Sequence, residues 1–207
     1  MKAVDAVPAL FTTYAYYNSD KFGFYGEELM RRCMAFRTLL DAGIRAAPGS
    51  DFSPGPYAPL MGIQGMVTRT GWNGETWGAN QRVSLEEAVR INTLNGAYNS
   101  HEEGLKRSIT PDKLADFVVL AEDPSTVDPE TIKDIEIVRT VVGGTTVYEV
   151  GPCHCAWRAR SQSMHVRSRR SYIDPIGLAR PGEACTSIRV LGINGPTHGF
   201  RGRAGLQ

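Results

Sequence analysis

The residue best placed to do chemistry is Asp51. It ends a short apolar run over residues 44–50, typical of a buried strand, and precedes a loop rich in Pro and Gly. Parallel α/β folds place catalytic groups at this position, at the carboxyl ends of strands. A carboxylate there could ligate a metal ion and take a proton from metal-bound water, whose pKa falls to about 7 on zinc. The alternative is a structural Asp that accepts hydrogen bonds from its own loop, and position alone favours it.

Other side chains are weaker candidates for a functional role. Tyr14, Tyr16 and Tyr17 could line a pocket, although aromatic residues at strand spacing are more often core. Asp116 lies in a strand-like run, and we expect it to be a half-exposed structural acid on a hairpin. His101-Glu102-Glu103 could bind a metal, but no second His lies at helical spacing, so a solvated helix end is expected.

A zinc site is also conceivable at Cys153-His154-Cys155. No second pair of ligands follows at zinc-finger spacing, so we attribute this cluster to chance composition. The sequence contains no phosphate-cradling Gly-rich loop, no HExxH motif and no GxSxG motif.

The elements that would position these residues begin as an α/β pattern. Residues 8–17 are rich in β-prone types and predict a buried strand that runs into an aromatic loop. Residues 26–42 have the apolar spacing of a helix, and Gly43 supplies its stop. Residues 44–51 then form a short strand. Strand, loop, helix and strand in this order indicate an α/β protein.

Two more helices are expected next. Residues 60–67 predict one, and Ser84 with Glu87 forms a capping box that opens another, which reaches about Thr93. Asn95-Gly96 is expected to break this helix before one further turn.

The hydrophobic periodicity then changes from that of helices to that of strands. Residues 113–120 and 135–142 predict two of them. Gly143-Gly144 supplies the positive φ angles of a two-residue hairpin turn, and residues 145–148 return antiparallel. A small β-module therefore follows the α/β segment.

The composition excludes several classes of protein. A chain of 207 residues with 42% hydrophobic residues can bury a core, which excludes wholesale disorder. No apolar run approaches ~18 residues, so no membrane span is predicted, and the first residues lack the apolar segment of a signal peptide. Four cysteines do not make a disulfide scaffold, which predicts a reducing, cytoplasmic environment.

The net charge of +1 conceals two unlike parts. Residues 151–207 hold nine Arg, no Lys and two acids, whereas residues 1–150 carry an excess of acids. Clustered arginines could bind nucleic acid, with steep salt dependence. The favoured alternatives are a disordered extension or an out-of-frame reading of a GC-rich gene. We therefore expect no nucleic-acid partner and no evolved function for this tail.

Several segments, in order, resemble the closing part of metal-dependent amidohydrolases, in the branch of N-substituted formamide deformylases and proteins labelled exoenzyme regulatory proteins. The resemblance extends from about Val7 to about Tyr148 and is absent beyond Gly151. The segments that carry it are RTLLDAGIR (37–45), GSD (49–51), PLMGIQ (59–64), VTR (67–69), SLEEA (84–88), TLNGAY (93–98), KLADFVVLAEDP (113–124) and VVGG (141–144).

The resemblance implies a fold and a division of the chain. It implies α/β architecture, the C-terminal portion of a (β/α)8 barrel followed by a small β-sandwich piece. Residues 1–105 would be the partial barrel, residues 106–150 the partial sandwich, and residues 151–207 the basic tail. Val7–Tyr14 would match the sixth barrel strand, and residues 44–49 a late strand, for which the eighth is expected.

The same resemblance implies a reaction and a site. Asp51 would match the family's metal-associated acid and act as metal ligand and general base in hydrolysis of a carbon–nitrogen bond of an amide or formamide. The metal would be divalent, with zinc expected. The loop with Phe52 and Tyr57 would form part of the substrate mouth, and Tyr14 and Tyr16 are further pocket candidates.

Departures from the family pattern predict an incomplete site. Tyr14 stands where many relatives carry a His, and the family's other histidines and bridging Lys or Glu have no counterpart. Residues 1–150 contain one His, His101, and a catalytic zinc needs at least three protein ligands. We therefore expect a fragment that is inactive alone, with a homo-oligomer or another chain as one way to cover its edges. A non-enzymatic regulatory or interaction protein is the alternative.

Overall fold

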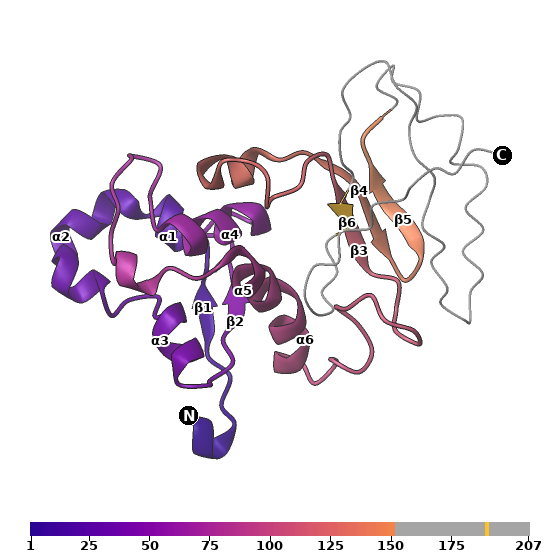
Figure 1. Cartoon of the computed structure of the whole chain (residues 1–207), viewed down its shortest axis with the longest axis horizontal. Coiled ribbons are helices and arrows are strands. Elements are labelled where there is room, and N and C mark those ends of the chain that lie inside the picture. Colours follow the sequence, from indigo (N-terminus) through magenta and orange to yellow (C-terminus); the bar gives the residue numbers. More distant parts are fainter. Residues whose placement is uncertain (152–188, 191–207) are drawn as a thin grey trace.

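The computed structural model describes residues 1–151 and 189–190. Two sheets organise these residues: a parallel pair, β1–β2, and an antiparallel sheet of order β5-β4-β3-β6. Figure 1 shows the pair inside the helical part, with α5 and α6 between it and the second sheet in this view. The described part is therefore α/β followed by a β-module, as the order of elements predicts.

The parallel pair joins β1 (Ala9–Phe11) to β2 (Ala47–Gly49), with Leu10 opposite Pro48. Both strands lie where the sequence predicts them. The prediction of a buried strand over residues 8–17 is wrong, because Ala9 and Phe11 are exposed and the chain enters helix α1 (Tyr14–Tyr17). The turn occurs because Thr13 O accepts the N–H groups of two tyrosines of this helix, Tyr16 and Tyr17.

The predicted helix over residues 26–42 is divided between α2 (Ser19–Met30), which is kinked at Gly26 (φ 74°, ψ 159°), and α3 (Phe36–Asp41). The prediction of one helix is wrong at residues 31–35, where the backbone turns. Arg69 Nη2 donates to Met30 O and Cys33 O, which are carbonyls that a continuing helix would use itself. A long-range contact therefore ends α2, and local apolar spacing could not reveal it.

Helix α4 (Pro59–Thr68) confirms the predicted helix and packs against α1. Two glycines make the contact close. A Cβ on Gly62 would lie 2.5 Å from Thr12 Oγ1, and one on Gly65 would lie 3.2 Å from Ala15 Cβ. Because glycine has no Cβ, α4 can pack closely against the turn that carries Tyr14. A short helical turn, η2 (Ala79–Gln81), follows α4, and η1 (Lys2–Val4) opens the chain.

The capping box is confirmed: Glu87 N donates to Ser84 Oγ and Ser84 N donates to Glu87 Oε2. It opens α5 (Leu85–Arg90), which continues through the π-helical segment η3 (Ile91–Asn95) into α6 (Gly96–Asn99). The predicted break at Asn95-Gly96 is wrong, because both residues have helical backbone angles. Asn95 Nδ2 donates to Ala46 O at 2.8 Å, so tertiary contact with the strand segment holds this part of the helix.

The second sheet contains β3 (Phe117–Leu120), β4 (Ile137–Val142), β5 (Thr145–Glu149) and β6 (Arg189–Val190), all antiparallel. The predicted hairpin is confirmed, with Gly143 and Gly144 at φ 56° and 80°. Asp116 is structural as expected, since its Oδ1 accepts Gly143 N at 2.7 Å.

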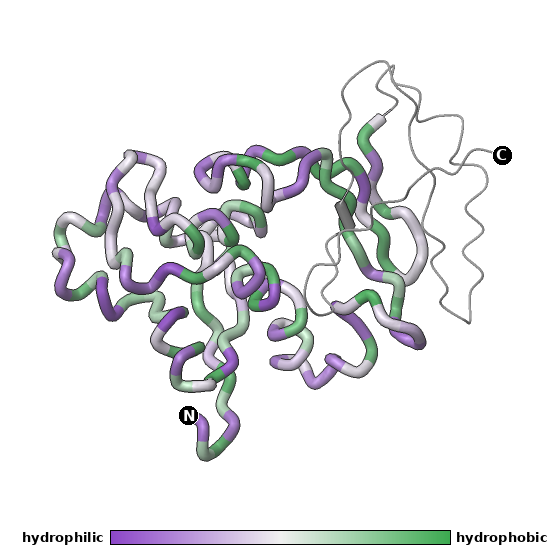
Figure 2. The backbone as a smooth tube through the Cα atoms, in the orientation of Figure 1, coloured by the Kyte–Doolittle hydropathy of each residue, from purple (hydrophilic) through white to green (hydrophobic). Residues whose placement is uncertain are grey.

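One hydrophobic core joins the two sheets. Leu120, Ile132 and Ile135 belong to the same buried cluster as Phe36 and Met66. Contact runs through η4 (Pro129–Asp134), which packs on α4. Figure 2 shows β3 and β4 as largely apolar, consistent with packing of this sheet toward the shared core.

Most of the basic tail lies outside the described residues, so the predictions for it, including the zinc alternative at residues 153–155, are not tested here. Residues 189–190 are described, and they pair with β3. Within the described ranges, no helix combines the length and apolar character that crossing a membrane requires.

Candidate active site

Asp51 stands two residues beyond β2, on an exposed and tightly closed loop. Its φ of 52° is left-handed, a conformation that Asp tolerates better than most residues. Gly55 N donates to Asp51 O at 2.8 Å, and a Cβ on Gly55 would lie 2.1 Å from Ser50 O. Only glycine fits this closure.

Tyr14 is the side-chain partner of Asp51. Its hydroxyl donates to Asp51 Oδ2 at 2.6 Å. The bond to the carboxylate, followed by desolvation, raises the pKa of Tyr14 above its ordinary value, because the carboxylate stabilises the protonated phenol. Tyr14 begins the helix after β1 and Asp51 follows β2, so the ends of two adjacent parallel strands bring the pair together.

An apolar groove of about 340 Å³ adjoins Tyr14. Its lining comes from β1, the start of α1, α2 and the turn after α2: Ala9, Leu10, Phe11, Tyr14, Phe22, Tyr25, Met30, Cys33 and Met34. Phe11 packs on Tyr14 with ring centroids 5.2 Å apart. The groove could hold an apolar substituent of a ligand whose polar group reaches Asp51.

Phe52 and Tyr57 lie together on the loop after Asp51. Their ring centroids are 6.0 Å apart, and the side chains are 71% and 78% exposed. Neither residue lines the groove beside Tyr14. The structure therefore provides two exposed rings that a substrate could meet on this loop.

Tyr16 lies apart from the pair formed by Tyr14 and Asp51. In a helix, residues two apart point about 200° away from each other, whereas in the predicted strand they would share a face. The ammonium of Lys133 lies 5.6 Å from the Tyr16 ring centroid, and Tyr16 does not line the groove. Helix formation at α1 is the physical reason that the two tyrosines separate.

No metal cluster forms among residues 1–151. No group of three or more His, Cys, Asp or Glu side chains is close enough in that range to hold an ion. His101 is exposed just after α6 at φ 56°, and Glu102 pairs with Lys106 at 2.6 Å, which agrees with the expected solvated helix end. Asp51 therefore remains the single candidate ligand at this loop.

Arg69 is a buried polar residue whose role the sequence analysis missed. It is 1% exposed, and its Nε donates to Trp77 O at 3.0 Å while Nη2 donates to the carbonyls of Met30 and Cys33. Burial lowers its pKa to about 10. A basic residue directly after the apolar helix was the available signal, but its partners lie 36 and 39 residues earlier in the chain.

Comparison with known proteins gives a consistent family. The model of the amidohydrolase family matches residues 1–148. The chain is 35% identical to the amidohydrolase YtcJ of Bacillus subtilis, over 60% of this chain and 24% of that protein. It is 32% identical to N-substituted formamide deformylase of Arthrobacter pascens, over 55% of this chain and 21% of that enzyme.

A solved structure, E. coli guanine deaminase, is 23% identical with a TM-score of 0.43, and the match covers 55% of this chain and 30% of that chain. The chain spans about a quarter or less of the length of these curated relatives.

Proposed function

The chain belongs to the amidohydrolase family, and from this premise we propose that Asp51 serves hydrolysis of a carbon–nitrogen bond in a small amide-type substrate. The observation that carries the proposal is the placement of the Asp51 carboxylate. It is exposed at the carboxyl end of a parallel strand pair, and Tyr14 from the neighbouring strand end holds one of its oxygens. This is where α/β folds gather catalytic groups.

We propose that the fold is the closing portion of a (β/α)8 barrel over residues 1–105, followed by part of a β-sandwich over residues 106–150. Two features support this. The β1–β2 pair is parallel with helices in the connection, as barrel strands are, and the later sheet is antiparallel. Both parts share one core, so they would fold together.

The chemistry proposed for Asp51 is proton transfer. Tyr14 donates to Oδ2, which leaves Oδ1 to accept a proton from the attacking water as the new carbon–oxygen bond forms at the carbonyl carbon. The carbon–nitrogen bond then breaks, and the proton goes to the departing amine, so the products are a carboxylic acid and an amine. The groove beside Tyr14 would take an apolar substituent, with Phe52 and Tyr57 at the mouth.

The amidohydrolase family is generally metal-dependent, and at the Asp51 loop residues 1–151 offer only one candidate metal ligand, Asp51. A catalytic zinc requires three protein ligands, and Asp51 has no further His, Cys, Asp or Glu cluster around it in this range. These residues do not fit a complete metal site. We propose that this chain does not hydrolyse amides alone and that further ligands would come from another chain.

Metal content of the purified full chain tests this proposal. After dialysis against a trace of zinc, elemental analysis of the wild type and of Asp51→Asn should give the same zinc content, because Asp51 alone holds no zinc. Tyr57→Phe serves as the control from the same loop. One zinc per chain that disappears in Asp51→Asn alone would mean that the chain completes a site around Asp51 and is a hydrolase in itself.

A second candidate function is self-association through the open edge of β1. Ala47 N donates to Pro8 O and Thr12 N donates to Gly49 O, so the backbone groups of Ala9 and Phe11 face away from β2. They have no strand partner in the described part of the chain. The outer edge of β2 is closed instead, since Pro48 lacks an N–H and Asn95 occupies Ala46 O.

The occupant proposed for this edge is a second copy of the chain, which would extend the pair into one sheet. Sedimentation equilibrium should then show a dimer of the wild type and a monomer of Ala9→Pro, because proline removes one outward N–H. A stable wild-type monomer would count against self-association. Separately, amide hydrolysis by the wild type that is lost in Asp51→Asn would rule out a non-enzymatic protein.

A further inference from the structure

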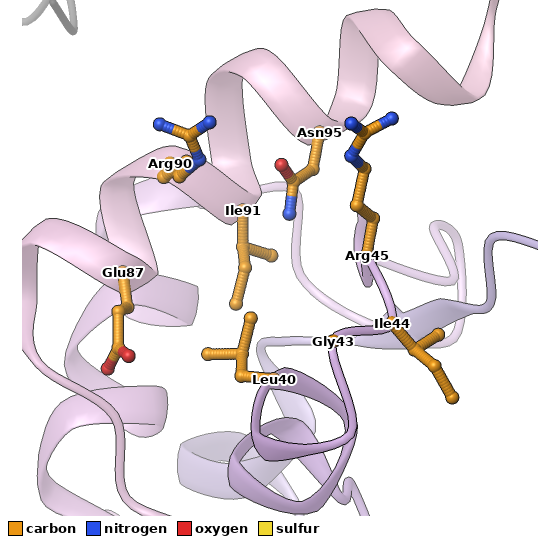
Figure 3. Close-up of a pocket in the computed structure, with 8 residues that line it drawn as sticks. All are labelled: Leu40, Gly43, Ile44, Arg45, Glu87, Arg90, Ile91 and Asn95. Atoms are coloured by element: carbon orange, nitrogen blue, oxygen red, sulfur yellow. The ribbon is translucent and has the colours of Figure 1, made fainter. Parts of the chain in front are cut away.

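A second cleft lies at the end of β2 opposite Asp51. It encloses about 200 Å³ between the end of α3, the residues that lead into β2, and helix α5 with η3. Its lining residues are Leu40, Gly43, Ile44, Arg45, Glu87, Arg90, Ile91 and Asn95. Figure 3 shows Leu40 and Ile91 pointing toward each other across its middle. Ile91 is fully buried and Leu40 half-buried, so of these two residues Leu40 offers the apolar surface of the floor.

Two cations flank this floor without an ion-pair partner. Neither Arg45 nor Arg90 makes a salt bridge or side-chain hydrogen bond to any residue that the structure describes, and both are exposed. The only acid that lines the cleft, Glu87, is paired with Arg37, which donates to both carboxylate oxygens at 2.8 and 2.9 Å and also pairs with Asp41. The cleft lining itself therefore holds two arginines and one acid.

Both arginines line this cleft. Figure 3 shows their guanidinium groups on the same side of the cleft, on either side of Asn95. Arg45 lies over the ring of Tyr98, with its central carbon 3.8 Å from the ring centroid. Stacking on the ring orients the guanidinium plane and leaves its in-plane N–H donors available. Arg90 ends α5 directly before the π-helical segment, a kind of irregularity that often occurs at binding sites.

We propose that this cleft binds a small aliphatic carboxylate, its charged group between Arg45 and Arg90 and its alkyl part against the half-buried Leu40. A planar carboxylate matches the fork of N–H donors on a guanidinium, and charge-assisted hydrogen bonds of this kind are the strong ones. The cleft lies before β2 and Asp51 after it, so this site is separate from the proposed hydrolytic one and does not depend on it.

Calorimetric titration of the full chain with sodium butyrate tests the proposal, with butyramide as the uncharged match. Butyrate should bind and butyramide should not, and added salt should weaken binding because the arginines are exposed. Arg90→Gln and Arg45→Gln should each weaken binding about tenfold or more, the loss expected for a charge-assisted hydrogen bond. Arg32→Gln, an exposed arginine paired with Glu28, should leave the affinity unchanged.

Three results would overturn the proposal. Equal binding of butyrate and butyramide would mean that charge is not recognised. Inorganic phosphate that binds as tightly as butyrate would refute a carboxylate site. Butyrate binding that survives both Arg90→Gln and Arg45→Gln would place the ligand elsewhere. Because Arg90 has no described side-chain partner, Arg90→Gln should unfold at the wild-type urea concentration, which separates lost binding from lost fold.

Discussion

Asp51 and Arg69 have nearly the same backbone φ angle and opposite surroundings. Their φ angles are 52° and 55°, and each closely follows a regular element, β2 for Asp51 and α4 for Arg69. Asp51 is exposed, and its carboxylate has one side-chain partner, Tyr14. Arg69 is 1% exposed and donates to three backbone carbonyls from two other segments.

This difference predicts that the charge of Arg69 stabilises the fold and that the charge of Asp51 does not. Removal of the Arg69 guanidinium would leave the half-buried carbonyls of Cys33 and Trp77 without this donor, and the Met30 carbonyl with Cys33 N. Removal of the Asp51 charge leaves a tyrosine hydroxyl that water can reach. Of these two charged residues in left-handed backbone, one is buried among backbone acceptors and the other is exposed to solvent. Burial and the set of partners distinguish the two.

The largest effect is expected for Arg69→Met. It should lower the free energy of unfolding by about 3 kcal/mol, because the carbonyls of Met30, Cys33 and Trp77 lose the Arg69 donor. Urea unfolding followed by circular dichroism measures it. Arg32→Gln, at a surface pair with Glu28, should change stability by less than about 0.5 kcal/mol. Equal effects of the two substitutions would refute the structural role of Arg69.

A smaller loss is expected for Gly62→Ala, which tests the support beneath Tyr14. The new Cβ would lie 2.5 Å from Thr12 Oγ1, and overpacking of this kind costs about 1–3 kcal/mol. Gly23→Ala in α2 is the matched control, since its Cβ meets nothing closer than 4.0 Å and should stabilise the helix by up to about 1 kcal/mol. Thermal unfolding of both variants measures the contrast. A stabilised Gly62→Ala would contradict the close packing described.

Local signals predicted part of this fold and not the rest. The capping box at Ser84, the Gly143-Gly144 turn and the position of Asp51 at a strand end follow from residue types and short spacings, and all three are confirmed. The break after Met30 and the bond between Tyr14 and Asp51 depend on contacts 37 or more residues apart. Apolar periodicity contains no information on such contacts, which is why one helix was predicted where two exist.

Glu87 is intermediate between the two extremes and gives a dependence on pH. Burial raises its pKa, but hydrogen bonds from Ser84 and Arg37 outweigh this and hold the pKa below its usual value. A carboxyl whose folded pKa is depressed stabilises the fold at neutral pH, and this contribution is lost as pH falls through the folded pKa. Glu87→Gln should therefore cost about 1 kcal/mol at neutral pH.

The difference between wild type and Glu87→Gln should shrink as pH falls below the usual range of a glutamate carboxyl. Urea unfolding across an acid series measures it. Ser84→Ala gives the comparison, because it removes the hydroxyl acceptor for Glu87 N without removing a charge. Its cost of about 1 kcal/mol should vary less with pH. A Glu87→Gln deficit that stays constant into acid would show that the charge contributes nothing.

The smallest effect on stability is expected where the chemistry is proposed. Asp51→Asn keeps the shape of the side chain on an exposed loop, so the free energy of unfolding should change by less than about 0.5 kcal/mol. Urea unfolding of this variant beside Arg69→Met decides between the two interpretations that the sequence left open. A loss above about 1 kcal/mol would make Asp51 a residue that holds its own loop, as Arg69 holds α2. An unchanged stability leaves the Tyr14-bonded carboxylate with no structural task, as expected of a group kept for proton transfer.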